Sequence, residues 1–298
     1  MKLYRTTRFE VGDSIFIPGD IHLGATDWKA LTLAINAFAT YTRRVGRKAK
    51  CLVLGDLIDS AYISRHGKEA QSSFKLDDAQ IAAFAMLLKS YQIEPTLAVM
   101  GNHENWFKSY AKENPGLDHD HLYPNLYKHF EVVPAEAVVR LNANLYACHG
   151  HQLRGSCTKY PAQAVLNNYP GSSWVFGHNH RLSLAYRTVY HPDKGRQMHA
   201  AMSVGTFYDE AMELGHPALS STAQEHSLGF GVVNLFRNDY FTLSLGTIHP
   251  TDEGYTVLLN DQLISESYIF PNPLAKQQTK QQTKQQTKQQ TKQEVTHE

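Results

Sequence analysis

The sequence has few cysteines and no recognisable export signal. Its three cysteines, Cys51, Cys148 and Cys157, form no CxxC pair, and an odd number of cysteines does not suit a disulfide framework. The first ten residues alternate charged and apolar side chains, so they lack the apolar centre of a signal peptide. We therefore expect reduced thiols and a cytoplasmic protein.

Long apolar segments and a surplus of one charge are also missing. The longest apolar run is the eight residues from Ile81 to Leu88, whereas a membrane-spanning helix needs about 20. The 29 Lys and Arg residues nearly balance the 28 Asp and Glu residues. No membrane span is therefore expected, and the overall charge excludes a protein dedicated to coating nucleic acid, because such proteins carry a basic surplus.

The C-terminal segment differs in composition from the rest of the chain. From Lys276 the tetrapeptide KQQT occurs four times in succession. A segment with almost no apolar residues cannot bury enough surface to offset its ordering entropy. We predict one domain over residues 1–270 and a disordered low-complexity tail over 271–298. The alternative is that the weakly basic tail tethers an anionic partner.

The first half of the chain alternates strand and helix patterns. Short apolar runs predict strands at 14–19, 51–54 and 95–100, and amphipathic patterns predict helices at 27–44 and 77–89. This order is typical of an α/β fold, in which polar loops at the carboxyl ends of the strands form binding sites.

The second half is rich in predicted strands. Six segments have strand patterns, and one helix, at 161–168, lies among them. The strand segments are 137–149, 173–177, 182–188, 200–206, 230–236 and 240–247. We expect them to form a second sheet that packs on the first within a single domain.

Histidine is abundant, with 16 residues, and many of them lie in five short motifs at predicted strand ends. Each motif alone is weak evidence for a metal site, but five motifs in order at strand ends are strong evidence for one. Carboxylate, amide and imidazole groups together suit Mn, Fe, Zn or Mg centres. The motifs are Asp20-Ile-His22, Gly55-Asp56-Leu-Ile-Asp59, Gly101-Asn102-His103-Glu104, His149-Gly-His151 and Gly177-His178-Asn-His180.

This series of motifs resembles that of the calcineurin-like metallophosphoesterase superfamily. The match covers Asp20 to His180 with every core motif present. The resemblance implies a four-layer α/β/β/α sandwich, with two mixed β-sheets flanked by helices, and two divalent metal ions at the carboxyl ends of the strands. Mn is the expected metal, and the ligand types also suit Fe, Zn, Ni or Mg.

The resemblance also implies a role for each motif residue. Asp56 would bridge the two ions, His103 would be the general acid, and Asp59 would orient His103. The first ion would be held by Asp20, His22, Asp56 and His180. The second ion would be held by Asp56, Asn102, His149 and His178.

Such a site hydrolyses phosphoesters with a metal-activated hydroxide, while the general acid protonates the leaving group. We predict a phosphodiester substrate, in a nucleotide or a nucleic acid. Ser60 stands where the phosphoprotein phosphatase branch carries an arginine that holds a phosphomonoester. The alternatives are a phosphomonoesterase acting on a small metabolite or nucleotide, and a catalytically silent scaffold of the same fold. The presence of His103 argues against the scaffold.

Several residues near the motifs have no assigned role. His151 is either a substrate or outer-sphere contact or a solvated loop residue, and Arg154 and Arg181 either reach a phosphate or lie on the surface. The run Asp118-His-Asp-His121 is expected to be a polar surface loop, with a third metal site as the less favoured alternative.

Overall fold

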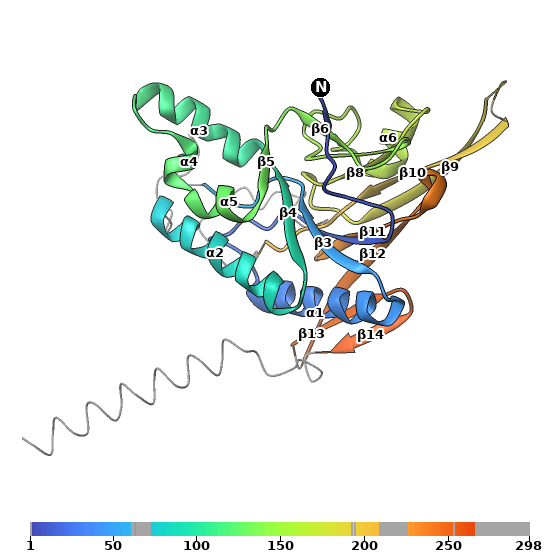
Figure 1. Ribbon diagram of the computed structural model, residues 1–298, viewed down its shortest axis with the longest axis horizontal. Coiled ribbons are helices and arrows are strands. Elements are labelled where there is room, and N and C mark those ends of the chain that lie inside the picture. The colour runs from blue at the N-terminus through green and yellow to red at the C-terminus, as the bar shows by residue number, and fades with distance from the viewer. Residues whose placement is uncertain are drawn as a thin grey trace, which may run out of the picture.

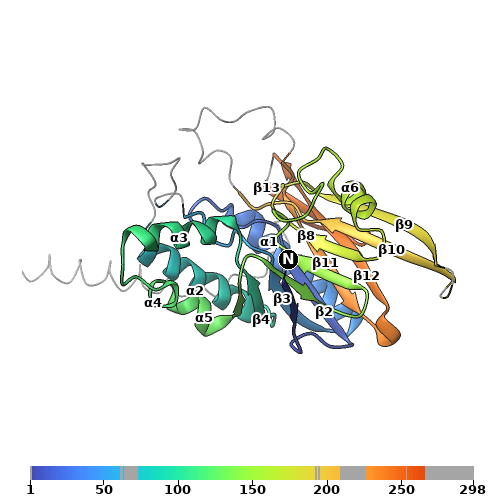
Figure 2. The same cartoon turned by 90° about the horizontal axis from the view of Figure 1, so that it is seen from above.

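The computed structural model describes residues 2–60, 63, 73–191, 193, 195–208, 226–252 and 254–265. Within these residues the chain forms two β-sheets and the helices that cover them (Figures 1 and 2). The tail predicted at 271–298 lies outside the described residues.

The larger sheet has eight strands and supplies three of the predicted motif loops. Its spatial order is β14-β13-β12-β11-β2-β3-β4-β5, with β2 to β5 parallel and β11 to β14 joined antiparallel to β2. Because parallel strands end at the same edge of a sheet, the loops after β2, β3 and β4 meet there. The strands are β2 (Asp13–Pro18), β3 (Lys48–Val53), β4 (Glu94–Val99), β5 (Glu131–Val133), β11 (Gly229–Leu235), β12 (Phe241–Thr251), β13 (Gly254–Leu259) and β14 (Gln262–Ser265).

The smaller sheet has six strands and supplies the other two motif loops. Its spatial order is β1-β6-β7-β8-β10-β9, with parallel pairing from β7 through β8 to β10. The loops after β7 and β8 therefore lie at one edge. The strands are β1 (Lys2–Arg5), β6 (Ala137–Arg140), β7 (Leu145–Cys148), β8 (Ser173–Phe176), β9 (Ser183–His191) and β10 (Gly195–Ser203).

Helices cover the outer face of each sheet. On the larger sheet lie α1 (Trp28–Val45) and α2 (Phe74–Ser90), and on the smaller sheet lies α6 (Pro161–Asn168). Helix α3 (Asn102–Glu113) and the short helices α4 (His119–Leu122) and α5 (Pro124–His129) follow β4, and a 3₁₀ turn, η4, spans Arg237–Asp239. Between the sheets, apolar side chains of both form a shared core, for example Ile15 and Leu97 with Val175 and Met202. The predicted α/β/β/α sandwich is confirmed.

Helix α1 shows how local sequence sets these elements. Its buried face includes Leu31, Ala34 and Phe38 at helical spacing. The Asp27 side chain accepts hydrogen bonds from the main-chain N–H groups of Lys29 and Ala30, which caps the helix start. The helix ends where Gly46 adopts the left-handed conformation.

One predicted strand is wrong. The segment 137–149 forms two antiparallel strands, β6 and β7, rather than one. The turn between them is stabilised by the Asn142 side chain, whose Oδ1 accepts hydrogen bonds from the N–H groups of Asn144 and Leu145. Asparagine side chains commonly stabilise turns in this way, so Asn142 and Asn144 were the missed signal of a turn.

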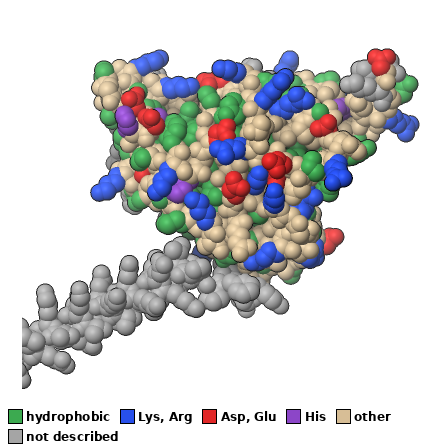
Figure 3. Space-filling view, in the orientation of Figure 1, with side chains coloured by type: hydrophobic (Ala, Val, Ile, Leu, Met, Phe, Trp, Pro, Cys, Tyr) green, Lys and Arg blue, Asp and Glu red, His purple; other side chains and the backbone are tan. Residues whose placement is uncertain are grey.

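The surface carries mixed charge. On the face in Figure 3, Lys and Arg side chains alternate with Asp and Glu side chains rather than forming a patch of one sign. None of the described helices has the length and apolar character that crossing a membrane requires.

Candidate metal centre

The five motifs meet where the carboxyl ends of both sheets converge. Strands β2, β3 and β4 of the larger sheet are followed by the first three motifs, and β7 and β8 of the smaller sheet by the last two. All seven residues predicted as ligands lie at these strand ends: Asp20, His22, Asp56, Asn102, His149, His178 and His180.

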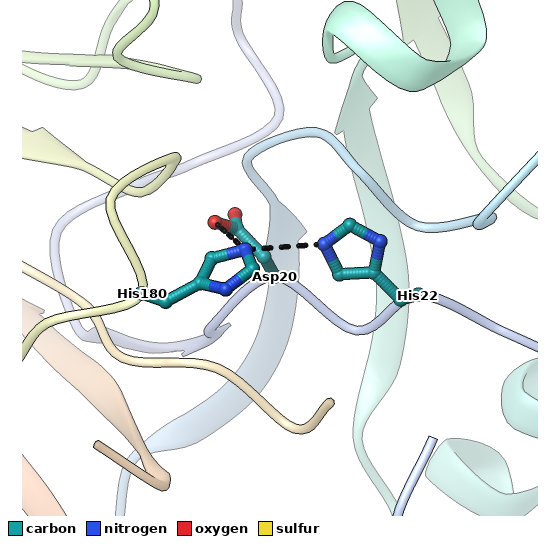
Figure 4. Close-up of side chains that lie close together, drawn as sticks. All are labelled: Asp20, His22 and His180. Atoms are coloured by element: carbon teal, nitrogen blue, oxygen red, sulfur yellow. Dashed lines mark hydrogen bonds and ion pairs between the residues drawn. The ribbon is translucent and has the colours of Figure 1, made fainter. Parts of the chain in front are cut away.

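One group of potential ligand atoms comprises Asp20, His22 and His180, whose atoms lie within 4.8 Å of one another. His180 Nε2 is 3.3 Å from Asp20 Oδ2 and 3.2 Å from His22 Nε2 (Figure 4). Asp59 Oδ1 accepts a hydrogen bond from the His22 Nδ1–H at 3.3 Å, so Nε2 carries the lone pair in the neutral ring. A carboxylate oxygen and two imidazole nitrogens that face one point fit a divalent cation.

A second group comprises Asp56, His149 and His178, again within 4.8 Å. His149 Nδ1 donates a hydrogen bond to the Leu54 carbonyl at 2.7 Å, so Nε2 carries the lone pair in the neutral ring. That nitrogen faces two acceptors, Asn102 Oδ1 at 2.8 Å and Asp56 Oδ2 at 3.3 Å. Three electron-rich atoms around one point repel one another unless a cation lies between them, so this donor set also fits a metal.

Asp56 lies between the two groups. Its Oδ2 is 3.3 Å from His149 Nε2 and 4.0 Å from His22 Nε2, one residue from each group. Burial alone would raise the pKa of Asp56, but the facing His149 and His103 hold it well below its usual range. An ionised carboxylate in this position is suited to bridging two cations.

The protonation of the ligands reflects the negative charge that the site concentrates. Burial opposes a charged imidazole, yet the Asp56 carboxylate outweighs burial and raises the pKa of His149 to about 9. For His22, the hydrogen bond to Asp59 and the charge of Asp56 likewise outweigh burial and raise its pKa to about 9. Burial, reinforced by the charge of Asp56, raises the pKa of Asp20 to about 7. The site therefore favours positive charge at the points where cations would bind.

His103 lies beside the bridging carboxylate, at the start of α3. Its Nε2 is 3.9 Å from Asp56 Oδ2, and its ring packs on Trp106 with a centroid distance of 4.0 Å. Its Nδ1 donates a hydrogen bond to the main-chain carbonyl of Asp59 at 2.5 Å, while the Asp59 carboxylate is 3.7 Å away. Asp59 thus contacts His103 through its main chain, and its carboxylate bonds to His22, a contact that the motif did not indicate.

Glu104 has a role that the sequence reading did not assign. The side chain is buried, and its carboxylate accepts hydrogen bonds from the main-chain N–H groups of Asp56, Ile58 and Gly101 at 3.1, 3.1 and 2.6 Å. It therefore ties the loop after β3 to the loop after β4. The available signal was a glutamate three residues after the N-cap residue, since its side chain can accept from the N-cap N–H, as Glu104 does from Gly101 at the start of α3.

Gly101 shows how closely these two loops approach. A Cβ atom at position 101 would overlap the Asp56 carboxylate. A larger residue would push the two loops apart, so glycine is required here by the packing around the bridging ligand.

The remaining candidates lie at the edge of the site or away from it. The His151 ring is 5.3 Å from the His149 ring and 6.0 Å from the His178 ring. Arg181 donates from Nη1 to the Thr158 carbonyl, and the main-chain N–H of Arg154 donates to the Tyr169 hydroxyl. The exposed group of Asp118, Asp120 and His121 lies around α4 and not at the strand ends.

Comparison with known proteins agrees with the fold and with the chemistry of the site. The sequence model of the calcineurin-like phosphoesterase family matches residues 14–198. The chain therefore belongs to this family. No curated protein matches the sequence.

The solved structures that the chain matches share little sequence with it. A single mutant of Vps29 from Entamoeba histolytica is 12% identical, covering 85% of this chain and 99% of its own, with a TM-score of 0.39. Wild-type Vps29 from the same organism, complexed with zinc, is 14% identical, covering 83% and 97%, with a TM-score of 0.37. A cold-active protein-tyrosine phosphatase from a Shewanella species is 12% identical, covering 83% and 80%, with a TM-score of 0.37.

Proposed function

We propose that the protein is a two-metal phosphodiesterase. The observation that carries this proposal is the convergence of two separate ligand groups on Asp56, with His103 Nε2 beside the same carboxylate. Asp20, His22, Asp56 and His180 would hold one ion, and Asp56, Asn102, His149 and His178 would hold the other. When bound, such ions would lower the pKa of a water molecule and neutralise charge on the phosphoryl oxygens.

The chain's own residues supply positioning and a proton. Asp59 and Leu54 accept the Nδ1 protons of His22 and His149, which directs both Nε2 lone pairs toward the cations. The Asp59 carbonyl fixes the His103 ring so that its Nε2 faces the reacting group. With both ring nitrogens protonated, the His103 imidazolium would donate its Nε2 proton to the departing alkoxide and become the neutral ring, which keeps the Nδ1 hydrogen bond to the Asp59 carbonyl.

The charge around the site favours a diester over a monoester. A monoester carries one more negative charge than a diester and calls for an additional cationic side chain. In the described part of the chain, every ion pair of Asp20, Asp56 and Asp59 is with a histidine. Ser60, buried and uncharged, supplies no cation.

We also propose manganese as the metal and the cytoplasm as the location. The oxygen and imidazole ligands suit Mn²⁺. Cys157 is free and exposed, which fits a reducing compartment.

A comparison of leaving groups tests the proposal. Bis(p-nitrophenyl) phosphate has a leaving group that departs without a proton, whereas diphenyl phosphate has a leaving group that needs one. With added Mn²⁺ we expect hydrolysis of both diesters in preference to p-nitrophenyl phosphate. Replacing His103 by alanine should slow diphenyl phosphate hydrolysis by roughly 10²–10⁴-fold and slow the nitrophenyl diester much less.

The control is His121→Ala, because His121 is exposed on α4, and its rates should equal those of the wild type. A preference for p-nitrophenyl phosphate would support the phosphomonoesterase instead. Absence of hydrolysis with two ions bound would support the scaffold. Equal losses on both diesters would contradict the role of His103 as proton donor.

A further inference from the structure

A cavity of about 570 Å³ adjoins the first ligand group, a volume typical of sites for small organic molecules. Two of its lining side chains contact the proposed metal ligands directly. The His226 ring packs edge-on against His180 with a centroid distance of 4.6 Å, and Tyr208 packs edge-on against His22 at 5.2 Å. A group that enters the cavity therefore lies next to the Asp20, His22 and His180 cluster shown in Figure 4.

The cavity wall is tied to the ligand loops by hydrogen bonds. Thr206 Oγ1 donates to the Asp20 carbonyl at 2.8 Å, and the Ser227 N–H donates to the His180 carbonyl at 2.8 Å. Thr206 and Ser227 are joined in turn by a main-chain hydrogen bond of 3.0 Å. The position of the cavity relative to the ligands is therefore set by the main chain.

The lining suits an uncharged ring. Among the described residues that line the cavity there is no lysine or arginine. Asp27 is the one carboxylate, and its oxygens are engaged by the cap of α1 and by the Tyr255 hydroxyl. Aromatic rings from Tyr208 and Tyr255 alternate with aliphatic side chains such as Ile248, and Thr247 and His249 add polar groups. Aromatic side chains stack on bases of any type, whereas a nucleic-acid strand also needs a basic groove along its phosphates.

The cavity is also separate from the contacts of His103. In the described part of the chain, the rings that His103 packs on are His22 and Trp106, and neither lines the cavity. A group held in the cavity therefore lies away from the proton donor, His103. Because His103 faces the leaving group, this is the position expected of the group that stays on phosphorus.

We propose that this cavity binds the nucleoside retained on phosphorus in a small nucleotide diester. The assignment rests on the proposed phosphodiesterase function and narrows its substrate class. It disfavours a polynucleotide, because the described residues of the lining include no lysine or arginine for further phosphates.

Three phosphodiesters test the proposal. They share the p-nitrophenolate leaving group and differ in the group that stays on phosphorus. They are the thymidine 5′-phosphate, methyl phosphate and phosphorylcholine esters. For the wild type with Mn²⁺, we expect kcat/KM for the thymidine ester to exceed that for the methyl ester by roughly 10- to 100-fold, the size of one stacking contact.

Thr247→Trp should fill the cavity and lower kcat/KM for the thymidine ester to the value for the methyl ester. Thr251→Trp is the matched control, because Thr251 lies on the same strand outside the lining, and it should retain the preference. His249→Trp fills the cavity from an exposed position and serves if Thr247→Trp does not fold.

Thymidine binding, measured by calorimetry, separates this proposal from the proposed function. Suppose that neither the thymidine ester nor the methyl ester is hydrolysed, but that free thymidine binds and Thr247→Trp loses this binding. The cavity assignment then stands, and the proposed phosphodiesterase function fails. If both esters are hydrolysed equally and thymidine does not bind, the phosphodiesterase stands and the cavity assignment is overturned. Preference for the phosphorylcholine ester would overturn the assignment of an uncharged group.

Discussion

Several proposed ligands have a backbone conformation that side chains other than glycine rarely adopt. His22, Asp56, His178 and His180 have φ values of 51°, 46°, 74° and 57°. Each such residue costs on the order of 1–3 kcal/mol and persists only where surrounding contacts enforce it. Here the hydrogen bonds between the loops provide these contacts, since Asp20 Oδ2 accepts from the His178 N–H at 2.7 Å. Strain is thus concentrated where several side chains must point at one spot.

Glu104 is the residue whose removal best tests that coupling. Replacing it by glutamine leaves one acceptor oxygen for three N–H groups and turns an amide N–H₂ toward them. Because the loop that carries Asp56 would loosen, we expect metal affinity to fall roughly 10- to 100-fold, as outer-sphere changes typically cause. Calorimetric titration with Mn²⁺ measures the affinity.

Glu113→Gln, at the exposed end of the same helix, is the control and should bind as the wild type does. Unchanged affinity in Glu104→Gln, with both variants folded by circular dichroism, would contradict the positioning role of Glu104.

The sequence indicated the types of residue in the site but not all of their partners. The motifs predicted which carboxylates, amide and imidazoles gather at the strand ends, and the structure brings all of them together. They did not predict that Asp59 bonds to His22 or that Tyr208 and His226 pack on the ligands. Those contacts depend on how distant loops approach, and no local pattern encodes this.

At the scale of elements, buried strands and long amphipathic helices were predictable. The helix predicted at 161–168 matches α6, and that predicted at 27–44 matches α1 within a residue at each end. The helices after β4 were missed. Helices α4 and α5, with four and six residues, carry too little periodicity, and α3, with 12 residues, buries only Glu104 and Phe107 and so lacks an apolar stripe. Strands β13 and β14 at the sheet edge were missed as well.

The glycine at the C-terminal end of α1 allows the contribution of the helix end to the free energy of unfolding to be tested. Gly46 has a φ of 65° and open space around its Cα, whereas Gly171 has open space without a positive φ. Gly46→Ala should therefore lower the free energy of unfolding by about 1 kcal/mol, the cost of a left-handed Cβ. Gly171→Ala should change it by less than about 0.5 kcal/mol. Urea denaturation measures both, and equal effects would contradict the assigned helix end.

At the scale of the whole molecule, the site exists because two sheets end at the same place. One ligand group spans both sheets, since Asp20 and His22 follow β2 while His180 follows β8; the other joins Asp56 after β3 to His149 after β7. Neither of these two groups is complete on one sheet. The sequence order of the motifs was consistent with this arrangement, but only the packing of the sheets through their shared core brings the groups together.

The domain limits remain a prediction. The shared core between the sheets supports a single domain over residues 1–270, and composition alone supports a disordered segment at 271–298.

The central claim is that the chain holds two divalent ions in separate groups that share Asp56. Counting the ions by elemental analysis after dialysis against Mn²⁺ tests this most directly. We predict two ions per chain for the wild type and for His121→Ala, and fewer for His149→Ala and for His180→Ala, each of which removes a ligand from one group. One ion or none in the wild type, or full occupancy in both ligand variants, would contradict the claim.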